Sequence, residues 1–163
     1  MTAPAACLKG WYQDLTGQED CKACPAGSYC DRQGLIAVSA TCPAGFYCPL
    51  NQVNKHEFMC LAGYTCAAGS STATPCPKGK YCHLSTLTTD CLAGYYCDEF
   101  QTKQPNPAGK TCPRGNYCAA GSINPTQCPV GKYNNKLGSS SLAECLDCPQ
   151  GKKEFIFKIT NFV

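Results

Sequence analysis

A seven-residue frame, in which two cysteines flank a central glycine and a tyrosine precedes the second cysteine, constrains the fold of this chain more than any other feature. Pro follows the first cysteine in most copies, Thr65 replaces Tyr in the third, and Asn134 replaces the second cysteine of the seventh. Self-similarity at so short a period predicts an array of small repeated modules rather than one globular domain. The seven copies begin at Cys24, Cys42, Cys60, Cys76, Cys91, Cys112 and Cys128.

Composition indicates that cross-links, and not a large core, hold these modules together. The 163 residues include 17 cysteines, a density typical of disulfide scaffolds in secreted proteins, so we expect an extracellular or cell-surface location. Leu, Ile, Val and Phe together fall below the roughly 20% level at which a chain can bury enough apolar surface. The predicted fold class is small and disulfide-rich, mostly irregular with short β-strands, with the tandem cysteine-rich modules forming an elongated rod.

Within each frame the residue order predicts a strand that enters a tight turn. Pro fixes its own φ and favours extended geometry at the preceding cysteine. The glycine two residues later can adopt the positive φ that a tight turn needs. We expect the Tyr ring to pack on a neighbouring disulfide or on the next repeat while its hydroxyl reaches water. An exposed aromatic ladder that binds carbohydrate or peptide is the alternative.

The odd number of cysteines leaves one thiol without a partner in the chain. The two ends read alike, which predicts single-disulfide fingers closed by Cys7–Cys21 and Cys128–Cys145, with Cys148 unpaired or pairing outside the chain. The remaining cysteines divide evenly either between consecutive frames or within each frame, and spacing does not choose between these schemes. Pairing across the variable loops ranks last because it strands Cys24. The cysteines expected in disulfides are Cys7, Cys21, Cys24, Cys30, Cys42, Cys48, Cys60, Cys66, Cys76, Cys82, Cys91, Cys97, Cys112, Cys118, Cys128 and Cys145.

The frames and the Cys-x-x-Cys steps between 21 and 24 and between 145 and 148 resemble the ephrin-receptor-like cysteine-rich repeat of the growth-factor-receptor superfamily, over residues 7 to 151. This resemblance implies interleaved disulfides between consecutive frames, such as Cys24–Cys42 with Cys30–Cys48. The expected division is a finger at 1–23, repeat pairs at 24–59, 60–90 and 91–127, a second finger with the start of a truncated module at 128–151, and a β-prone tail at 152–163.

Long tandem arrays of this frame look most like surface and extracellular-matrix proteins of protists. By that likeness we expect an extracellular structural protein, a stalk, coat or filament component on a protist cell or ciliary surface. Its expected partners are other copies of itself or other filament proteins. The alternative is a receptor-like ectodomain that binds a protein ligand, although one Trp and two Arg, at Trp11, Arg32 and Arg114, are few for a binding hot spot.

The sequence offers little for catalysis, and we expect no enzyme, cofactor or metal. The two Cys-x-x-Cys steps lack a second pair at zinc spacing, and His56 and His83 lie in variable loops. The basic residues are scattered and no run is long enough for a membrane span, so neither nucleic acid nor a membrane span is expected. The start of the chain lacks the pattern of a signal peptide, which suggests a fragment of a longer secreted protein.

Two further features lie outside the frames. Small hydroxylated residues beside Pro in the variable loops suit O-linked glycans, and plain flexible loops are the alternative. The tail 154–163 reads as a single strand that either pairs with another subunit or is not native sequence. The candidate glycosylation residues are Ser70, Ser71, Thr72, Thr74, Thr126, Ser139, Ser140 and Ser141.

Overall fold

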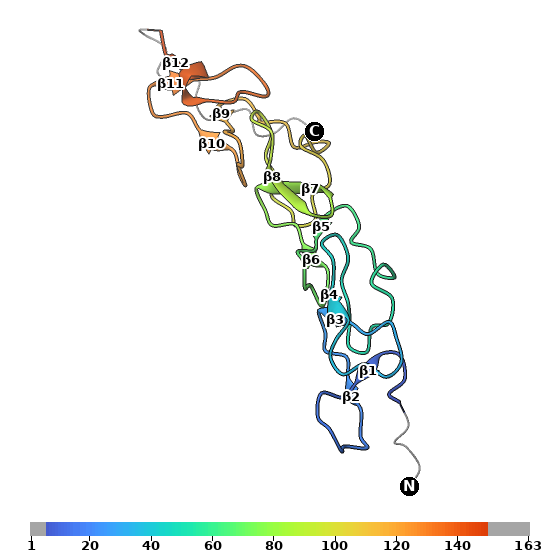
Figure 1. Cartoon of the computed structure of the whole chain (residues 1–163). Coiled ribbons are helices and arrows are strands. Elements are labelled where there is room, and N and C mark those ends of the chain that lie inside the picture. The colour runs from blue at the N-terminus through green and yellow to red at the C-terminus, as the bar shows by residue number, and fades with distance from the viewer. Residues whose placement is uncertain (1–5, 150–163) are drawn as a thin grey trace. The chain divides into compact units, whose positions relative to one another are not determined.

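The computed structural model describes residues 6–149 (Figure 1), so the predicted tail at 152–163 lies outside the described residues. The chain forms two compact units. Unit 1 comprises Met1–Cys76 and Cys82–Thr88, and unit 2 comprises Pro77–Tyr81 and Thr89–Val163. The elongated arrangement of the whole chain and its division at 24–59, 60–90 and 91–127 stay predictions.

Both units consist of short antiparallel hairpins joined by irregular segments, which confirms the predicted fold class. In the described part of the chain the helical content is one 3₁₀ turn at Leu142–Glu144. The hairpins pair β1 (Trp11–Tyr12) with β2 (Lys22–Ala23), β3 (Ser28–Tyr29) with β4 (Ala40–Thr41), β5 (Tyr64–Thr65) with β6 (Thr74–Pro75), β7 (Lys80–Leu84) with β8 (Leu87–Asp90), β9 (Asn116–Tyr117) with β10 (Thr126–Gln127), and β11 (Lys132–Tyr133) with β12 (Leu146–Asp147).

Five of the six hairpins share one register relative to the frames, which we number 1 to 7 from Cys24 to Cys128. The residue after the frame glycine pairs with the residue before the first cysteine of the next frame, as in Ser28 with Thr41 and Asn116 with Gln127. Frames 2 and 5 have isolated bridges at the same place, for example Phe46 with Met59. Each hairpin therefore leads from one frame directly into the next.

The turn at the centre of each frame has the predicted geometry. In frame 1 the Ser28 N–H donates to the Pro25 carbonyl at 3.1 Å, and Gly27 between them has φ +85°. A type II turn needs a positive φ at its third residue, which glycine adopts without steric cost. The same three-residue hydrogen bond recurs in every frame.

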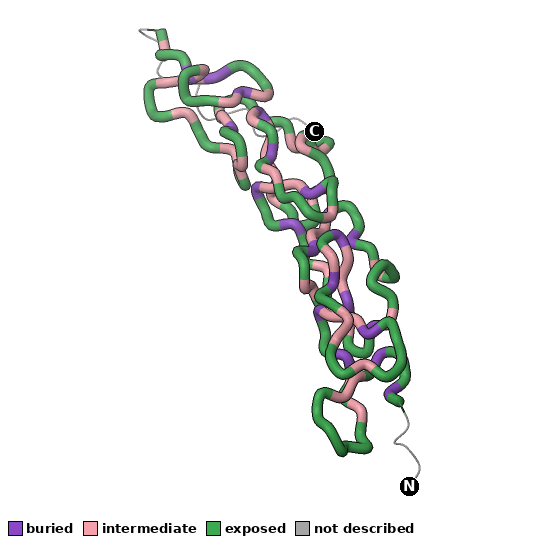
Figure 2. The backbone as a smooth tube through the Cα atoms, viewed as in Figure 1, coloured by how far each residue is buried: buried purple, intermediate pink, exposed green. Residues whose placement is uncertain are grey.

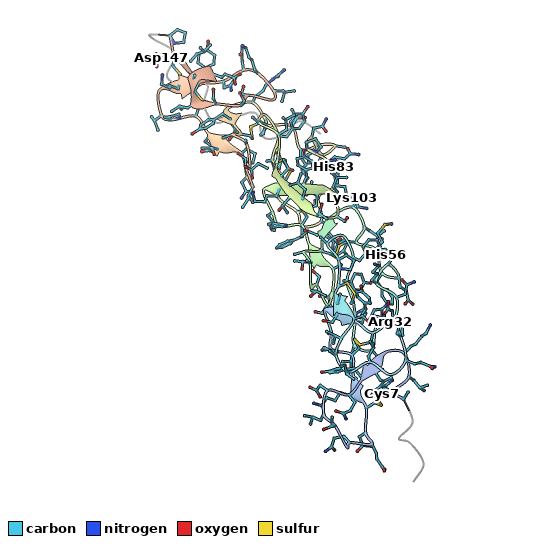
Figure 3. All side chains as sticks on the ribbon, viewed as in Figure 1. Cys7, Arg32, His56, His83, Lys103 and Asp147 are labelled. Carbon is cyan, nitrogen blue, oxygen red and sulfur yellow. A yellow bond between two sulfur atoms is a disulfide. The ribbon has the colours of Figure 1, made fainter. Side chains whose placement is uncertain are left out.

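The structure pairs the cysteines of frames 1 to 6 within each frame, as in Cys24–Cys30, with Cα atoms 5.8–6.1 Å apart. The interleaved scheme implied by the resemblance is therefore wrong here, because the Pro-x-Gly turn already brings the two ends of one frame within bonding reach. Disulfides Cys7–Cys21 and Cys128–Cys145 join the fingers, and Cys148 is not in a disulfide. Figure 3 shows the sulfur atoms among all described side chains.

Sulfur takes the place of an aliphatic core in both units. Among the described residues every buried apolar side chain is a cysteine, and the cysteines of frames 1 to 6 are at most 4% exposed. Large apolar side chains such as Leu8, Ile36 and Val130 lie on the surface instead. In Figure 2 the buried positions accordingly form short scattered stretches along the tube.

Candidate functional site

The junction between consecutive frames is the most regular feature of the molecule and the candidate functional site. At the junction of frames 1 and 2, the N–H and C=O of Gly27 are held by Cys48 and Cys42, the two cysteines of frame 2. The backbone of frame 1 is in turn bonded to the segment that follows frame 2. The four bonds are Asn51 N–H to Cys24 O at 2.9 Å, and Gly27 N–H to Cys48 O, Cys42 N–H to Gly27 O and Cys30 N–H to Gln52 O, each at 2.8 Å.

The same four bonds recur at three other junctions, with N···O distances of 2.7–2.9 Å. The glycines in these bonds are Gly45, which joins frames 2 and 3 in unit 1, and Gly94 and Gly115, which join frames 5, 6 and 7 in unit 2. Because every bond involves backbone atoms, the ladder tolerates variation of the side chains between the cysteines. These four junctions therefore share one geometry while their surfaces differ.

Frames 1, 4 and 5 also contact the segment after the second frame along the chain. A Cβ placed on Gly94 would lie 2.5 Å from the Gly138 carbonyl oxygen, and one on Gly79 would lie 2.6 Å from the Gly121 carbonyl oxygen. In unit 1, Gly27 meets the Gly69 carbonyl in the same way. Real Cβ atoms do not approach so closely, so these positions require glycine for space as well as for φ. Three successive frames thus form the smallest packed group.

Sequence reasoning missed that residues 7–13 form a further frame. Gly10 lies three residues after Cys7, has φ +85°, and donates its N–H to the Cys30 carbonyl at 2.9 Å. Gln13 stands where the second cysteine would be, as Asn134 does in frame 7. The Cys-x-x-Gly spacing at Cys7 was the available signal. Both fingers are therefore frames in which an amide residue replaces the second cysteine.

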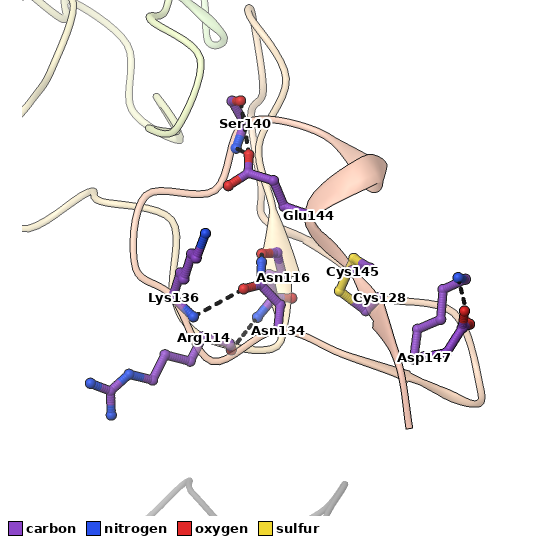
Figure 4. The surroundings of a disulfide bond; sticks show 10 residues. Arg114, Asn116, Cys128, Asn134, Lys136, Ser140, Glu144, Cys145 and Asp147 are labelled. Carbon is purple, nitrogen blue, oxygen red and sulfur yellow. Dashed lines mark hydrogen bonds and ion pairs between the residues drawn. A yellow bond between two sulfur atoms is a disulfide. The ribbon is translucent and has the colours of Figure 1, made fainter. Parts of the chain in front are cut away.

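Asn134 holds the end of frame 7 on frame 6 and on the segment that follows with hydrogen bonds, at the position where frames 1 to 6 have a disulfide cysteine (Figure 4). Its side chain, only 5% exposed, donates from Nδ2 to the Asn116 carbonyl and accepts at Oδ1 from the Lys136 N–H, each at 3.0 Å. Its own carbonyl accepts the Gly115 N–H at 2.7 Å. Cys128, left without a partner in its frame, is joined to Cys145. The ladder therefore continues through a frame that lacks its own disulfide.

Cys148 occupies the first-cysteine position of the next frame. Its N–H donates to the Gly131 carbonyl at 2.9 Å, as the first cysteine of each earlier frame does, and its side chain is half-buried. Residue 154, six positions further, is Glu. The frame that Cys148 begins therefore lacks the second cysteine that closes the earlier ones.

The candidate glycosylation residues differ in their accessibility. Ser139 is 1% exposed, so its hydroxyl cannot carry a glycan in the folded molecule. The Ser70 hydroxyl donates to the Ala67 carbonyl at 2.8 Å, and the Ser140 hydroxyl donates to Glu144 at 3.0 Å. Exposed positions are Ser71, Thr72, Thr74, Thr126 and Ser141, and glycosylation there stays a prediction.

Ion pairs cross several hairpins, and most lie in solvent. Lys22 Nζ lies 2.6 Å from Asp14, and Lys132 Nζ lies 2.7 Å from Asp147. The Lys22 ammonium lowers the pKa of the Asp14 carboxyl by hydrogen bonding to it. Exposed pairs of this kind contribute roughly 0–1 kcal/mol each, so they adjust the hairpins and do not hold the fold.

The tyrosines that precede the second cysteines are half-buried, which places each ring at the edge of a frame. Tyr47 stacks on Phe58 with centroids 5.3 Å apart. Lys55 Nζ lies 5.9 Å from the Tyr29 centroid, and Lys110 Nζ lies 5.7 Å from the Tyr96 centroid. The rings thus serve as local packing surfaces that lysines partly cover.

The described residues contain no cluster of three or more side chains suited to a metal ion, and no described helix is long and apolar enough to cross a bilayer. His56 contacts Phe46, with ring centroids 4.8 Å apart, and His83 lies in β7. A cavity of about 310 Å³ in unit 2 is lined by one loop, 99–104 with Pro107 and Ala108. None of these features assembles a nucleophile, base and orienting acid.

Comparison with known proteins supports an extracellular, receptor-like cysteine-rich module. Residues 5–41 match the family model described as tyrosine-protein kinase ephrin type A/B receptor-like, which confirms the resemblance for the first finger and the start of the array. The matched segment contains Cys7, Cys21 and the whole of frame 1. A search of curated proteins found no match.

Proposed function

We propose that this chain is an extracellular structural protein, a disulfide-stapled rod that serves as a stalk, coat or filament component. The observation that carries the proposal is the backbone ladder, in which each frame glycine is held by both ends of the following frame. A chain that repeats one junction can grow in one direction without a large core. Its function would then lie in its length and stiffness.

The proposed mechanism is mechanical. Each of frames 1 to 6 is closed by a disulfide between cysteines six positions apart, so pulling on the chain cannot open these frames themselves. The four hydrogen bonds of a junction act side by side, and the contact two frames along braces the junction on either side. Tension would therefore load several weak bonds together before any junction separates.

The setting and the partners are part of this proposal. The likeness of the frames to protist arrays supports a protist cell or ciliary surface, and other copies or other filament proteins would be the partners. The exposed Ser71, Thr72 and Thr74 suit attached glycans because they lie on the surface of one loop. Exposed Leu and Val side chains suit lateral contacts with neighbouring filaments.

A second candidate function is a receptor-like ectodomain that binds a protein ligand, and the family match over residues 5–41 favours it. Trp11, in β1 of this segment, is 37% exposed and would be the anchor of such a contact. Binding would then concentrate at the first finger, whereas the structural role uses every junction.

Small-angle scattering and negative-stain electron microscopy of the oxidised protein test the structural role. A rod predicts a maximum dimension several times the cross-section, and a structural element predicts ordered filaments or sheets at high concentration. A compact particle would contradict the rod. A monomeric chain that binds one cell-surface protein through Trp11, and loses that binding in Trp11→Ala, would favour the receptor instead.

A further inference from the structure

Unit 1 contains a cavity of about 260 Å³ whose lining comes from three successive frames. Lys9 comes from the frame at residues 7–13, Tyr29 comes from frame 1, and Asp31 is the residue that follows frame 1. The segment after frame 2 contributes the rest. Stacking of frames two steps apart therefore creates the cavity. The remaining lining residues are Val53, Asn54 and Lys55.

The side chains that line this cavity, which we call the niche, combine an aromatic ring, an apolar side chain and polar groups. Lys55 Nζ lies over the Tyr29 ring, and Val53 is half-buried next to Gly10. Asn54 Oδ1 accepts the His56 N–H at 3.0 Å, which leaves the amide nitrogen of Asn54 to donate outward. Asp31 can accept hydroxyl donors beside its bond from the Ser39 hydroxyl at 2.6 Å.

Positive charge is in excess around this niche. Lys9 and Lys55 form no ion pair with any described carboxylate, whereas Asp31 already lies 3.5 Å from the Arg32 guanidinium. The other nearby acid, Glu57, accepts a hydrogen bond from Gln52 Nε2 at 2.8 Å. The three cations Lys9, Lys55 and Arg32 exceed the two carboxylates by one charge, which favours an anionic ligand.

The same residue types recur together once in unit 2. Ile123 lies 3.1 Å from a Cβ placed on Gly79, as Val53 lies 3.5 Å from one placed on Gly10. The position held by Lys9 is Ala in frames 1, 2, 3 and 5, and the acid is then absent as well. Because Tyr stands at this position in nearly every frame, the joint recurrence of the lysine, the acid and the asparagine is what distinguishes these two places. The matching pairs are Lys9 and Lys78, Tyr29 and Tyr96, Asp31 and Asp98, Val53 and Ile123, and Asn54 and Asn124.

The two niches differ in their charge. In unit 2, Lys110 lies over Tyr96 and forms ion pairs with Asp98 at 2.8 Å and with Glu99 at 3.2 Å. Its hydrogen bond holds the pKa of the Asp98 carboxyl below the usual range. Lys110 is thus paired with two carboxylates, whereas Lys55, the lysine over the Tyr ring in unit 1, is paired with none that the structure describes. The molecule thus carries a charged niche and a neutralised counterpart.

We propose that the niche of unit 1 binds an acidic saccharide, one sugar residue that bears a carboxylate or a sulfate. Lys9 and Lys55 would hold the anionic group, the Tyr29 face would pack on the sugar ring, and Asn54 and Asp31 would bond its hydroxyls. The Asp31 carboxylate disfavours a run of acidic peptide side chains but accepts hydroxyl donors. This inference is independent of the rod, which can exist without a ligand.

Calorimetric titration of the oxidised chain tests the proposal with four oligosaccharides or peptides of similar length. These probes are a galacturonate trisaccharide, a sulfated tetrasaccharide from heparin, neutral maltotriose and a tetraglutamate peptide. We expect binding of one or both acidic saccharides, and at least tenfold weaker binding of maltotriose and tetraglutamate. The carboxylated and sulfated probes show which anionic group the lysines prefer.

Matched variants separate a built site from general attraction of anions. Lys9→Ala with Lys55→Ala should weaken binding of the acidic saccharide at least tenfold, and Tyr29→Leu should weaken it several-fold. Lys103→Ala with Lys136→Ala removes the same charge from exposed positions elsewhere and should change binding less than twofold. Equal losses in both double variants, tighter binding of tetraglutamate, or no binding of either acidic saccharide would each overturn the proposal. Rod dimensions measured on the same samples test the structural role separately.

Discussion

Frames 6 and 7 are neighbours in unit 2 whose last residues are held by different chemistry. The Cys112–Cys118 disulfide closes frame 6 on itself, whereas the buried amide of Asn134 holds the end of frame 7 on frame 6. Yet both accept the preceding glycine N–H in the same way, at 2.8 Å for Cys118 O and 2.7 Å for Asn134 O. The geometry of the ladder therefore depends on the backbone, and a disulfide is one of two ways to hold it.

The disulfide and the Asn134 amide stabilise the fold differently, one by its effect on the unfolded chain and the other by its bonds in the folded chain. A disulfide restricts the unfolded chain, which in the chain-entropy model is worth about 2 kcal/mol for a loop of six residues. The Asn134 amide acts only in the folded chain, where its hydrogen bonds satisfy buried polar groups. Frame 7 accordingly adds the long Cys128–Cys145 link, while frames 1 to 6 need none.

Of the changes that separate the two kinds of frame, reduction of all disulfides is expected to lower the stability of the fold most. Frames 1 to 6 would lose closures whose sum is comparable to the whole net stability of a small domain, roughly 5–15 kcal/mol. The amide of Asn134 cannot hold the array alone. We expect excess dithiothreitol to abolish the circular dichroism of the folded chain and its resistance to protease. An unchanged spectrum and unchanged protease resistance would show that the sulfur bonds are not what holds the fold.

A second prediction asks whether the segment after frame 7 packs on earlier frames as tightly as the geometry indicates. Gly94→Ala places a methyl group 2.5 Å from the Gly138 carbonyl oxygen, whereas Gly115 has no described atom within 4 Å of the same position. Both glycines have a positive φ near +80°, so backbone strain of about 1–2 kcal/mol is common to both changes. The clash at Gly94 should add about 1–3 kcal/mol.

Urea unfolding of the two oxidised variants measures this difference directly. Gly115→Ala is the matched control, because it shares the turn, the ladder position and the unit. Similar unfolding free energies for the two variants would mean that the contact two frames along contributes nothing to stability.

Much of this architecture is readable in the sequence. The Cys-Pro-x-Gly order predicted the turn, and Gly27 has the expected positive φ. The spacing of Cys7 and Cys21 at one end, and of Cys128 and Cys145 at the other, pointed to the links that the structure shows. Local geometry within a few residues was therefore predictable, because Pro and Gly restrict it regardless of context.

The longer-range contacts were not predictable in the same way. The choice between interleaved and internal disulfides depends on which Cα atoms approach each other, and spacing alone allows both. The niche of unit 1 joins Lys9 to Val53 through the stacking of three frames, which no local pattern reveals. Asn134 was a departure from the frame in the sequence, and only its two hydrogen bonds show that it holds the end of frame 7 in place.

A third prediction tests how much the buried amide of Asn134 contributes to stability. Asn134→Ala removes a donor to the Asn116 carbonyl and an acceptor from the Lys136 N–H in a buried site, which should cost about 1–3 kcal/mol. Asn135→Ala, at the exposed neighbouring position, should change the unfolding free energy by less than about 0.5 kcal/mol. Equal small effects in urea unfolding would show that the Asn134 side chain adds nothing to the backbone bonds at Gly115 and the Cys128–Cys145 disulfide, which also hold frame 7.

The smallest effect is expected from Glu144, which holds the segment after frame 7. The Ser140 backbone N–H, at 2.7 Å from Oε1, and the Ser140 hydroxyl lower the pKa of this carboxyl below its usual value. A lowered folded pKa means that the contribution to stability is present above the ordinary carboxyl pKa and is lost as pH falls through the lowered one. Because the group is open to solvent, wild-type and Glu144→Gln melting temperatures at neutral pH should differ by no more than about 2 °C. The difference should vanish below the lowered pKa, since protonated Glu and Gln present similar groups to Ser140. A difference in melting temperature that stayed constant down to pH 2 would show that Glu144 acts through packing and not through its charge. Frame 7 would then be held by Asn134 and Cys128–Cys145 without an electrostatic contribution from Glu144.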